Sequence, residues 1–187
     1  MTVARDVLIE NEFEMTLLPG FDPSPADYLS NMERGAEISD CGRYRTRLWR
    51  RWDSRKGRVL VIMLNPSTAD ASQDDPTIRR CIRFAIRWEC GCLEVRNLFA
   101  LRATDQRELL AVADPVGPNN LCLVRSDDHF EKVVAAWGSH GGLLGRSTAI
   151  RGELSRRGIR AFHLGLTKSG EPRHPLYVPY QTPLQVL

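Results

Sequence analysis

The sequence lacks the features of a secreted or membrane-spanning protein. Its 187 residues contain five cysteines, which are too few and too scattered for a disulfide framework. No apolar run approaches the roughly 20 residues that cross a bilayer. Asp6, Glu10, Glu12 and Glu14 interrupt the first residues, which is unlike a secretory signal. We therefore expect a reduced, cytoplasmic protein with no membrane partner.

Several common catalytic and cofactor-binding motifs are also missing. The chain has no G-x-x-x-x-G-K-[ST] phosphate loop, no G-x-G-x-x-G after a strand and no G-x-S-x-G elbow. Cys90 and Cys92 form a close pair, but no second pair completes a zinc or iron–sulfur site. The sequence therefore predicts no metal and no cofactor.

Charge is present but unevenly distributed. The net charge is only +3, with 42% hydrophobic and 26% charged residues, which is ordinary globular composition. Residues 1–40 hold nine acidic and two basic side chains, whereas residues 43–58 hold eight basic side chains and one acidic. A total near neutrality therefore does not exclude an anionic partner.

Hydrophobic patterning predicts strands that alternate with helices. Largely apolar runs typical of buried strands cover residues 59–64, 93–99, 133–138 and 159–164. Asp75 and Pro76 are typical of a helix start, since an acid caps the helix and proline suits its first position. Further helices are expected around 120–130 and over 144–157, with Gly158 ending the latter.

These elements predict a three-layer α/β/α fold with a four-stranded, mostly parallel central sheet. Residues 43–48 alternate basic and other side chains, which predicts an additional, antiparallel arginine-rich edge strand. Residues 1–38 have weak periodicity and several prolines, so we interpret them as an N-terminal extension. Residues 39–187 are then a single α/β domain of ordinary size.

Polar side chains follow every predicted strand. In a parallel sheet, ligands bind beyond the carboxyl ends of the strands, so these side chains are expected to meet. The candidates in chain order are Asn65, Pro66, Ser67, Asp70, Asn97, Phe99, Trp137, Arg173 and His174. Each also has a simpler interpretation, because Asn-Pro-Ser is a common turn and aspartates often cap helices. The convergence of all four strand ends is what favours a site.

The chain also resembles a known family. The stretches CGRYRTRLWRRWD, VIMLNPSTAD, DDPTIRRCIRFA, VRNLFALRATD, AAWGSHG and RHPLYVP resemble the bacterial family called domain of unknown function 1643 (DUF1643). The resemblance spans about residues 40–180. The family label itself implies no activity.

The motif layout is also similar to the uracil-DNA glycosylase superfamily, whose fold has a four-stranded parallel sheet between helices. The segment 64–66 resembles the end of that superfamily's first active-site motif, with Met63 in place of the usual glycine. Asn97 matches the place of the base-reading asparagine. His174 matches the leaving-group histidine, although the Ser-Pro that follows it in the superfamily is absent.

The resemblance implies a glycosylase-like hydrolase that cleaves the N-glycosidic bond of a damaged or modified base in DNA. His174 would donate a hydrogen bond to the departing base, and Asn65 would position water with help from the carboxylate of Asp70 or Asp74. The base would be bound by Pro66, Ser67, Asn97, Phe99 and Trp137. Two alternatives stay open, namely an enzyme acting on free nucleosides or nucleotides and a non-catalytic nucleic-acid-binding module.

The arginine-rich segment predicts a DNA contact. Arg43, Arg45 and Arg47 would share one face of a strand at about 6.6 Å intervals, comparable to phosphate spacing along DNA. Arg173 would add a basic group beside the pocket. The simpler interpretations are a solvated edge strand whose charges prevent aggregation, or a face neutralised by residues 1–40.

Overall fold

The computed structural model describes residues 32–67, 69–118, 120 and 123–187. The chain divides into two compact units, Met1–Asn31 and Met32–Leu187, and the second unit carries the sheet. Most of the predicted N-terminal extension lies outside the described residues. Its last six residues, Glu33–Ile38, form strand β1 of the main sheet. The folded unit therefore starts earlier than residue 39.

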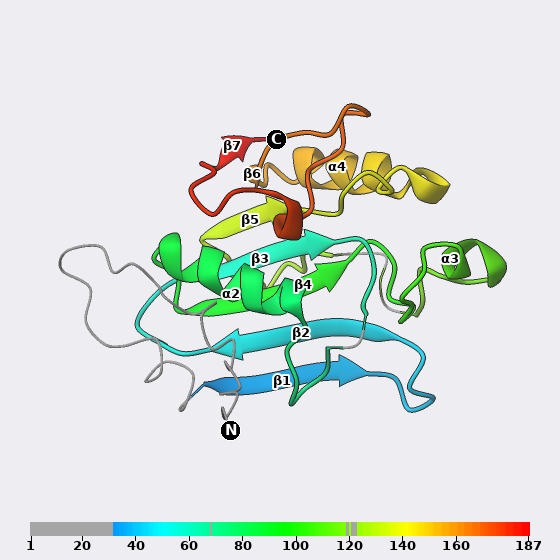
Figure 1. The fold of residues 1–187 in the computed structure, drawn as a ribbon, viewed down its shortest axis with the longest axis horizontal. Helices are drawn as coiled ribbons and strands as arrows, with labels where there is room; N and C mark the ends of the chain where they lie inside the picture. Colours follow the sequence, from blue (N-terminus) through cyan, green and yellow to red (C-terminus); the bar gives the residue numbers. More distant parts are fainter. Residues whose placement is uncertain (1–31, 68, 119, 121–122) are drawn as a thin grey trace, which may run out of the picture. The chain divides into compact units, whose positions relative to one another are not determined.

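Seven strands form one sheet within the described part of the chain, in the order β1-β2-β4-β3-β5-β6-β7. Their bounds are β1 Glu33–Ile38, β2 Arg45–Arg51, β3 Arg58–Met63, β4 Cys92–Asn97, β5 Lys132–Ala135, β6 Ala161–His163 and β7 Gln185–Val186. The pairs β4–β3, β3–β5 and β5–β6 are parallel, whereas β1–β2, β2–β4 and β6–β7 are antiparallel. The fold is mixed α/β (Figure 1).

This sheet is larger than the sequence predicts. The arginine-rich strand is β2, and it is antiparallel to β4 as expected. It is not an edge strand, however, because β1 pairs along its other side. The pattern of β1 is too weak to predict a strand, and β7 has only two residues.

Helix α2 (Pro76–Arg87) begins where the sequence predicts. The Asp75 carboxylate accepts a hydrogen bond from the Ile78 amide at 2.8 Å, and Pro76 occupies the first position. The apolar face of α2 is buried, and Figure 1 shows α2 crossing in front of β3 and β4. The C-terminal 3₁₀ turn η2 (Pro175–Tyr177) packs against it.

Helix α4 (Arg146–Arg156) confirms the helix predicted over 144–157, and Gly158 follows its end with a positive φ of 65°. The other two helical elements, α3 (Glu108–Ala111) and the 3₁₀ turn η1 (Leu143–Gly145), are short. The described residues of 120–130 contain no helix, so that prediction is wrong. Asp128 instead accepts from the Arg125 amide and from the Arg96 guanidinium, which holds the segment as a turn. No helix among the described residues is long and apolar enough to cross a bilayer.

The sheet contains a charged cluster around a fully buried carboxylate, beside its apolar core. Glu94 of β4 is 0% exposed and pairs with Arg47 at 2.9 Å, Arg58 at 2.8 Å and Arg96 at 2.6 Å. Because these guanidiniums come from β2, β3 and β4, the carboxylate ties three adjacent strands together. Buried charges persist in proteins when they are paired in this way.

Candidate functional site

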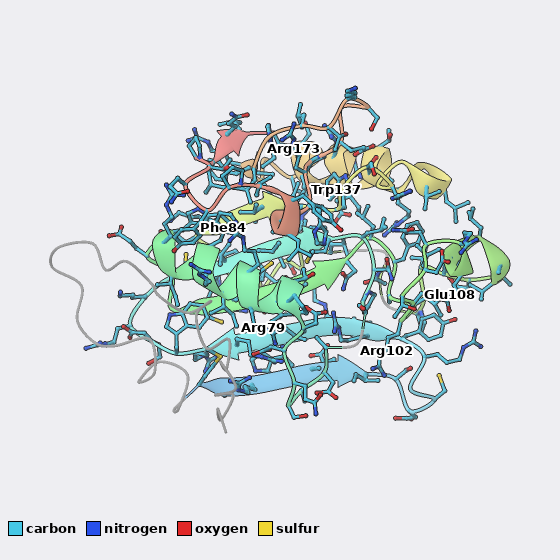
Figure 2. The ribbon with its side chains drawn as sticks, viewed as in Figure 1. Arg79, Phe84, Arg102, Glu108, Trp137 and Arg173 are labelled. Carbon is cyan, nitrogen blue, oxygen red and sulfur yellow. The ribbon has the colours of Figure 1, made fainter. Side chains whose placement is uncertain are left out.

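A cavity of about 550 Å³ lies at the carboxyl ends of the parallel strands. Its volume is in the range that accommodates small ligands. Its walls come from the carboxyl end of β3, from the segments that follow β3, β4, β5 and β6, and from η2. The lining residues are Met63, Leu64, Asn65, Ser67, Ala103, Thr104, Gln106, Trp137, Gly138, Ser139, His140, Thr167, Arg173, His174 and Tyr177. Trp137 and Arg173 are labelled in Figure 2. The strand-end rule therefore located a real concavity.

Asn65 enters the cavity directly after β3. Its side-chain nitrogen donates to the Ala103 carbonyl at 2.7 Å and to the Pro66 carbonyl at 3.1 Å. Both amide hydrogens are thus used, and no described residue donates to its Oδ1. This oxygen is an acceptor that a ligand or a water can use.

Two arginines hold the loop that carries Asn65 and Ser67. Arg50 is 0% exposed and donates from Nε to Asp74 at 2.8 Å and from Nη2 to the Asp70 carbonyl at 2.7 Å. Arg45 is also buried and donates to the Ala69 carbonyl. Side chains of β2 therefore fix the backbone between β3 and α2.

His174 also lines the cavity, at the start of η2. Its Nδ1 accepts a hydrogen bond from the Leu176 amide at 3.3 Å, so the neutral ring carries its proton on Nε2. Burial lowers the pKa of His174 below its ordinary value, which is only partly offset by the charge of Asp75. At neutral pH the ring is therefore an uncharged hydrogen-bond donor.

Trp137 forms a wall of the cavity and is itself 1% exposed. Its indole Nε1 donates to the Glu171 carboxylate at 2.6 Å, and the other oxygen of Glu171 accepts from Ser147 at 2.7 Å. A Cβ on Gly141 would lie 2.0 Å from the indole Cδ1. The ring is thus fixed both by its hydrogen bond and by the close approach of the backbone.

Among the described residues, no aspartate or glutamate lines the cavity. The charged member of the lining is Arg173, which is exposed and donates from Nε to the Leu166 carbonyl at 3.0 Å. The other polar members are amides, hydroxyls and imidazoles. Such a lining suits a ligand that presents hydrogen-bond acceptors or partial negative charge.

Four predicted site residues do not line the cavity. Asp70 accepts hydrogen bonds from the Gln73 and Ser72 amides and from the Ser72 hydroxyl, and these bonds lower its pKa. It is a loop-capping carboxylate. Phe99 is 0% exposed in the main apolar core, and Pro66 is buried. Asn97 is 1% exposed, and its side-chain nitrogen has no partner among the described residues.

The predicted DNA-binding face of the arginine-rich strand is largely internal. Arg47 pairs with Glu94 at 2.9 Å and Glu37 at 3.3 Å. Arg45 is buried, and burial lowers its pKa to about 10. Of the three arginines predicted to contact DNA, Arg43 alone is exposed, and it precedes β2. Glu37 of β1 belongs to the acidic segment that precedes the arginine-rich strand, whereas Glu94 of β4 lies 47 residues from Arg47.

Sequence analysis missed part of the cavity wall. Thr104 and Gln106 line it from a loop that reaches the site because Asn65 donates to Ala103. No local pattern in that loop predicts this. His140 and Tyr177 also line the cavity, and both stand in strand-end or motif segments that could have been singled out.

These features define a mixed α/β protein with a polar, ligand-sized cavity at its strand ends. The family model described as "Protein of unknown function (DUF1643)" matches residues 43–176. The chain belongs to this DUF1643 family. No curated protein and no solved structure matches it, so the similarity to uracil-DNA glycosylases has no support from these comparisons.

Proposed function

We propose that the cavity binds a nucleobase with its sugar and hydrolyses the N-glycosidic bond between them. The observation that carries the proposal is the pairing of a neutral Nε2–H donor on His174 with an unused acceptor on Asn65 in one cavity. No carboxylate stands among the described lining residues, which also favours a leaving group that becomes anionic.

The reaction would proceed by cleavage of the bond from the sugar C1′ to the base nitrogen, with both electrons leaving on the base. His174 donates a hydrogen bond to that developing anion, an electrostatic stabilisation that strengthens in a water-poor site. Asn65 Oδ1 accepts a hydrogen bond from a water that attacks C1′. The water loses its proton to solvent, and the released base gains one from solvent. Since an amide is a poor base, Asn65 positions the water and does not deprotonate it.

The substrate we favour is a damaged or modified base in DNA. Trp137 and Ser67 line the space where the base would lie, and Arg173 stands at the cavity. The proposal includes a glycosylase-like, three-layer arrangement, with which the three parallel strand pairs are compatible. It also includes a cytoplasmic location.

An alternative substrate is a free nucleoside or nucleotide. The internal pairing of Arg47 and the burial of Arg45 favour that alternative, because they remove most of the predicted DNA contact.

Direct assay of base release tests the proposal. Oligonucleotides with deaminated and modified bases are incubated with the protein and examined for abasic sites, and free nucleosides are examined for released base. We expect His174→Ala to lower release by about 100-fold or more. His129→Ala is the matched control, since His129 is exposed and does not line the cavity. If neither substrate class releases a base, the hydrolase is wrong and a non-catalytic nucleic-acid-binding module becomes the better account.

A further inference from the structure

Helix α2 carries an excess of positive charge for which the described residues supply no carboxylate partner. Between Pro76 and Arg87 it has four arginines and no acidic residue. We call Arg79, Arg80, Arg83 and Arg87 the arginine row. None of the four forms an ion pair with a carboxylate of the described residues. This distinguishes the row from the arginines of β2, where Arg47, Arg50 and Arg51 are all ion-paired.

Three of the four arginines in the row contact one aromatic ring, that of Tyr180. The guanidinium carbons of Arg80, Arg83 and Arg87 lie 5.8, 5.0 and 5.5 Å from the centre of the Tyr180 ring. Arg79 is exposed beside them and donates to the Asp74 carbonyl at 2.6 Å; it is labelled in Figure 2. Because cation–π contacts leave the net charge unchanged, the like charges remain clustered and attract an anion.

The arginine row continues from the cavity. Arg80 donates to the Val178 carbonyl at 2.6 Å, and the preceding residue, Tyr177, lines the cavity. The Tyr177 side chain is 77% exposed, which is unusual for a large aromatic ring. From there α2 extends for about 1.5 Å per residue along its arginines. A chain-like anion could therefore contact the row while one of its units enters the cavity.

We propose that a single strand of nucleic acid binds along α2, with its phosphates on the arginine row and a base stacked on Tyr177. A basic track with exposed aromatic rings is the usual arrangement of single-strand binding surfaces. This rests on the proposed function, in that the base next to the stacked one would enter the cavity. It also replaces the contact predicted for β2, where Arg47, Arg50 and Arg51 form ion pairs and Arg45 donates to the Ala69 carbonyl.

Binding of a fluorescein-labelled oligothymidine, followed by anisotropy over a range of salt concentrations, tests the proposal without any chemical step. The test variant is Arg79→Gln with Arg83→Gln, because neither side chain donates to the described C-terminal segment. The control is Arg156→Gln with Arg160→Gln, which removes the same charge from exposed arginines that precede the amino end of β6. That end of the sheet is opposite the cavity.

We expect the row variant to bind about tenfold more weakly at low salt, with the slope of log affinity against log salt reduced by about 1.4. The control pair is expected to change both quantities little. Tyr177→Ser should weaken binding about tenfold and leave the slope unchanged, because stacking releases no counterions. Equal effects of the two arginine pairs, or no binding by the unmodified protein at low salt, would overturn the proposal. A duplex that binds tighter than the single strand would overturn it as well.

The same measurements separate this proposal from the hydrolase. Binding that depends on the arginine row, in a protein that releases no base from any substrate, supports the row and contradicts the hydrolase. Base release from free nucleosides without oligothymidine binding supports the hydrolase and contradicts binding along the arginine row.

Discussion

The indole Nε1 of Trp137 donates to the carboxylate of Glu171 at 2.6 Å, joining the end of β5 to the segment after β6. Glu171 also accepts from Ser147 of α4 at 2.7 Å. One carboxylate therefore fixes a cavity wall from behind.

Replacing this carboxylate should loosen the wall. Glu171→Ala leaves a nearly buried indole N–H and the Ser147 hydroxyl without their acceptor, so we expect a loss of about 1–3 kcal/mol in the free energy of unfolding. Denaturant unfolding followed by tryptophan fluorescence measures it. Glu171→Gln keeps one acceptor oxygen and should lose less. Equal losses for both variants would show that the hydrogen bond from Trp137 does not determine the change in the free energy of unfolding.

Asn65 connects the β3 end to the loop that holds Thr104. Asn65→Asp replaces a donor by a carboxylate that faces the Ala103 and Pro66 carbonyls, which repels the loop and adds negative charge to the cavity. We expect base release to fall by about 100-fold, more than any stability loss explains. Activity and thermal unfolding are measured on the same preparation. Unchanged activity would remove Asn65 from the proposed mechanism.

The stability of the protein should depend on pH through His174. Burial lowers its pKa in the folded state, so the unfolded chain binds more protons in the range between the two pKa values. The stabilisation is complete above the unfolded pKa of about 6.5 and is lost as the pH falls toward the lower folded pKa. Urea unfolding across this range should show a smaller decline for His174→Gln than for the unmodified protein. A parallel decline in both would contradict the assignment.

Glu94 should be the most sensitive carboxylate of the sheet. Glu94→Gln leaves three guanidiniums from adjacent strands without their shared anion, and we expect a loss of about 3–5 kcal/mol. The matched control is Glu33→Gln, which breaks the exposed pair with Arg51 and should cost at most about 1 kcal/mol. Chemical denaturation compares them. Similar losses would mean that burial does not set the strength of these pairs.

The sequence predicted most of the elements that frame the cavity, because their signals are local. Apolar runs located β3 to β6, and the Asp75-Pro76 pair located the start of α2. The strand-end rule brought Asn65, Ser67, Trp137, Arg173 and His174 to one cavity. These residues were predictable because position along a strand determines which edge of the sheet they reach.

The failures at Arg47 and Phe99 have a different cause, which is contact between distant parts of the chain. Arg47 looked available for DNA because Glu94, its partner, lies 47 residues away. Asp70 is a different case, because the amides that it accepts from belong to Ser72 and Gln73 of its own loop, so its capping role is a local one. Phe99 follows β4 as expected, but the packing of the core decides that its ring is buried.

The loop from Ala103 to Gln106 contrasts with the rest of the cavity wall. Thr104 and Gln106 are exposed and lie outside the strands. Asn65 anchors their loop through the backbone carbonyl of Ala103. Substitutions at these two positions would reshape the opening without disturbing the sheet or the buried charges beneath it. The architecture therefore separates the part of the molecule that must stay constant from a part that can diversify, and members of one family could acquire different ligand preferences by changing that loop alone.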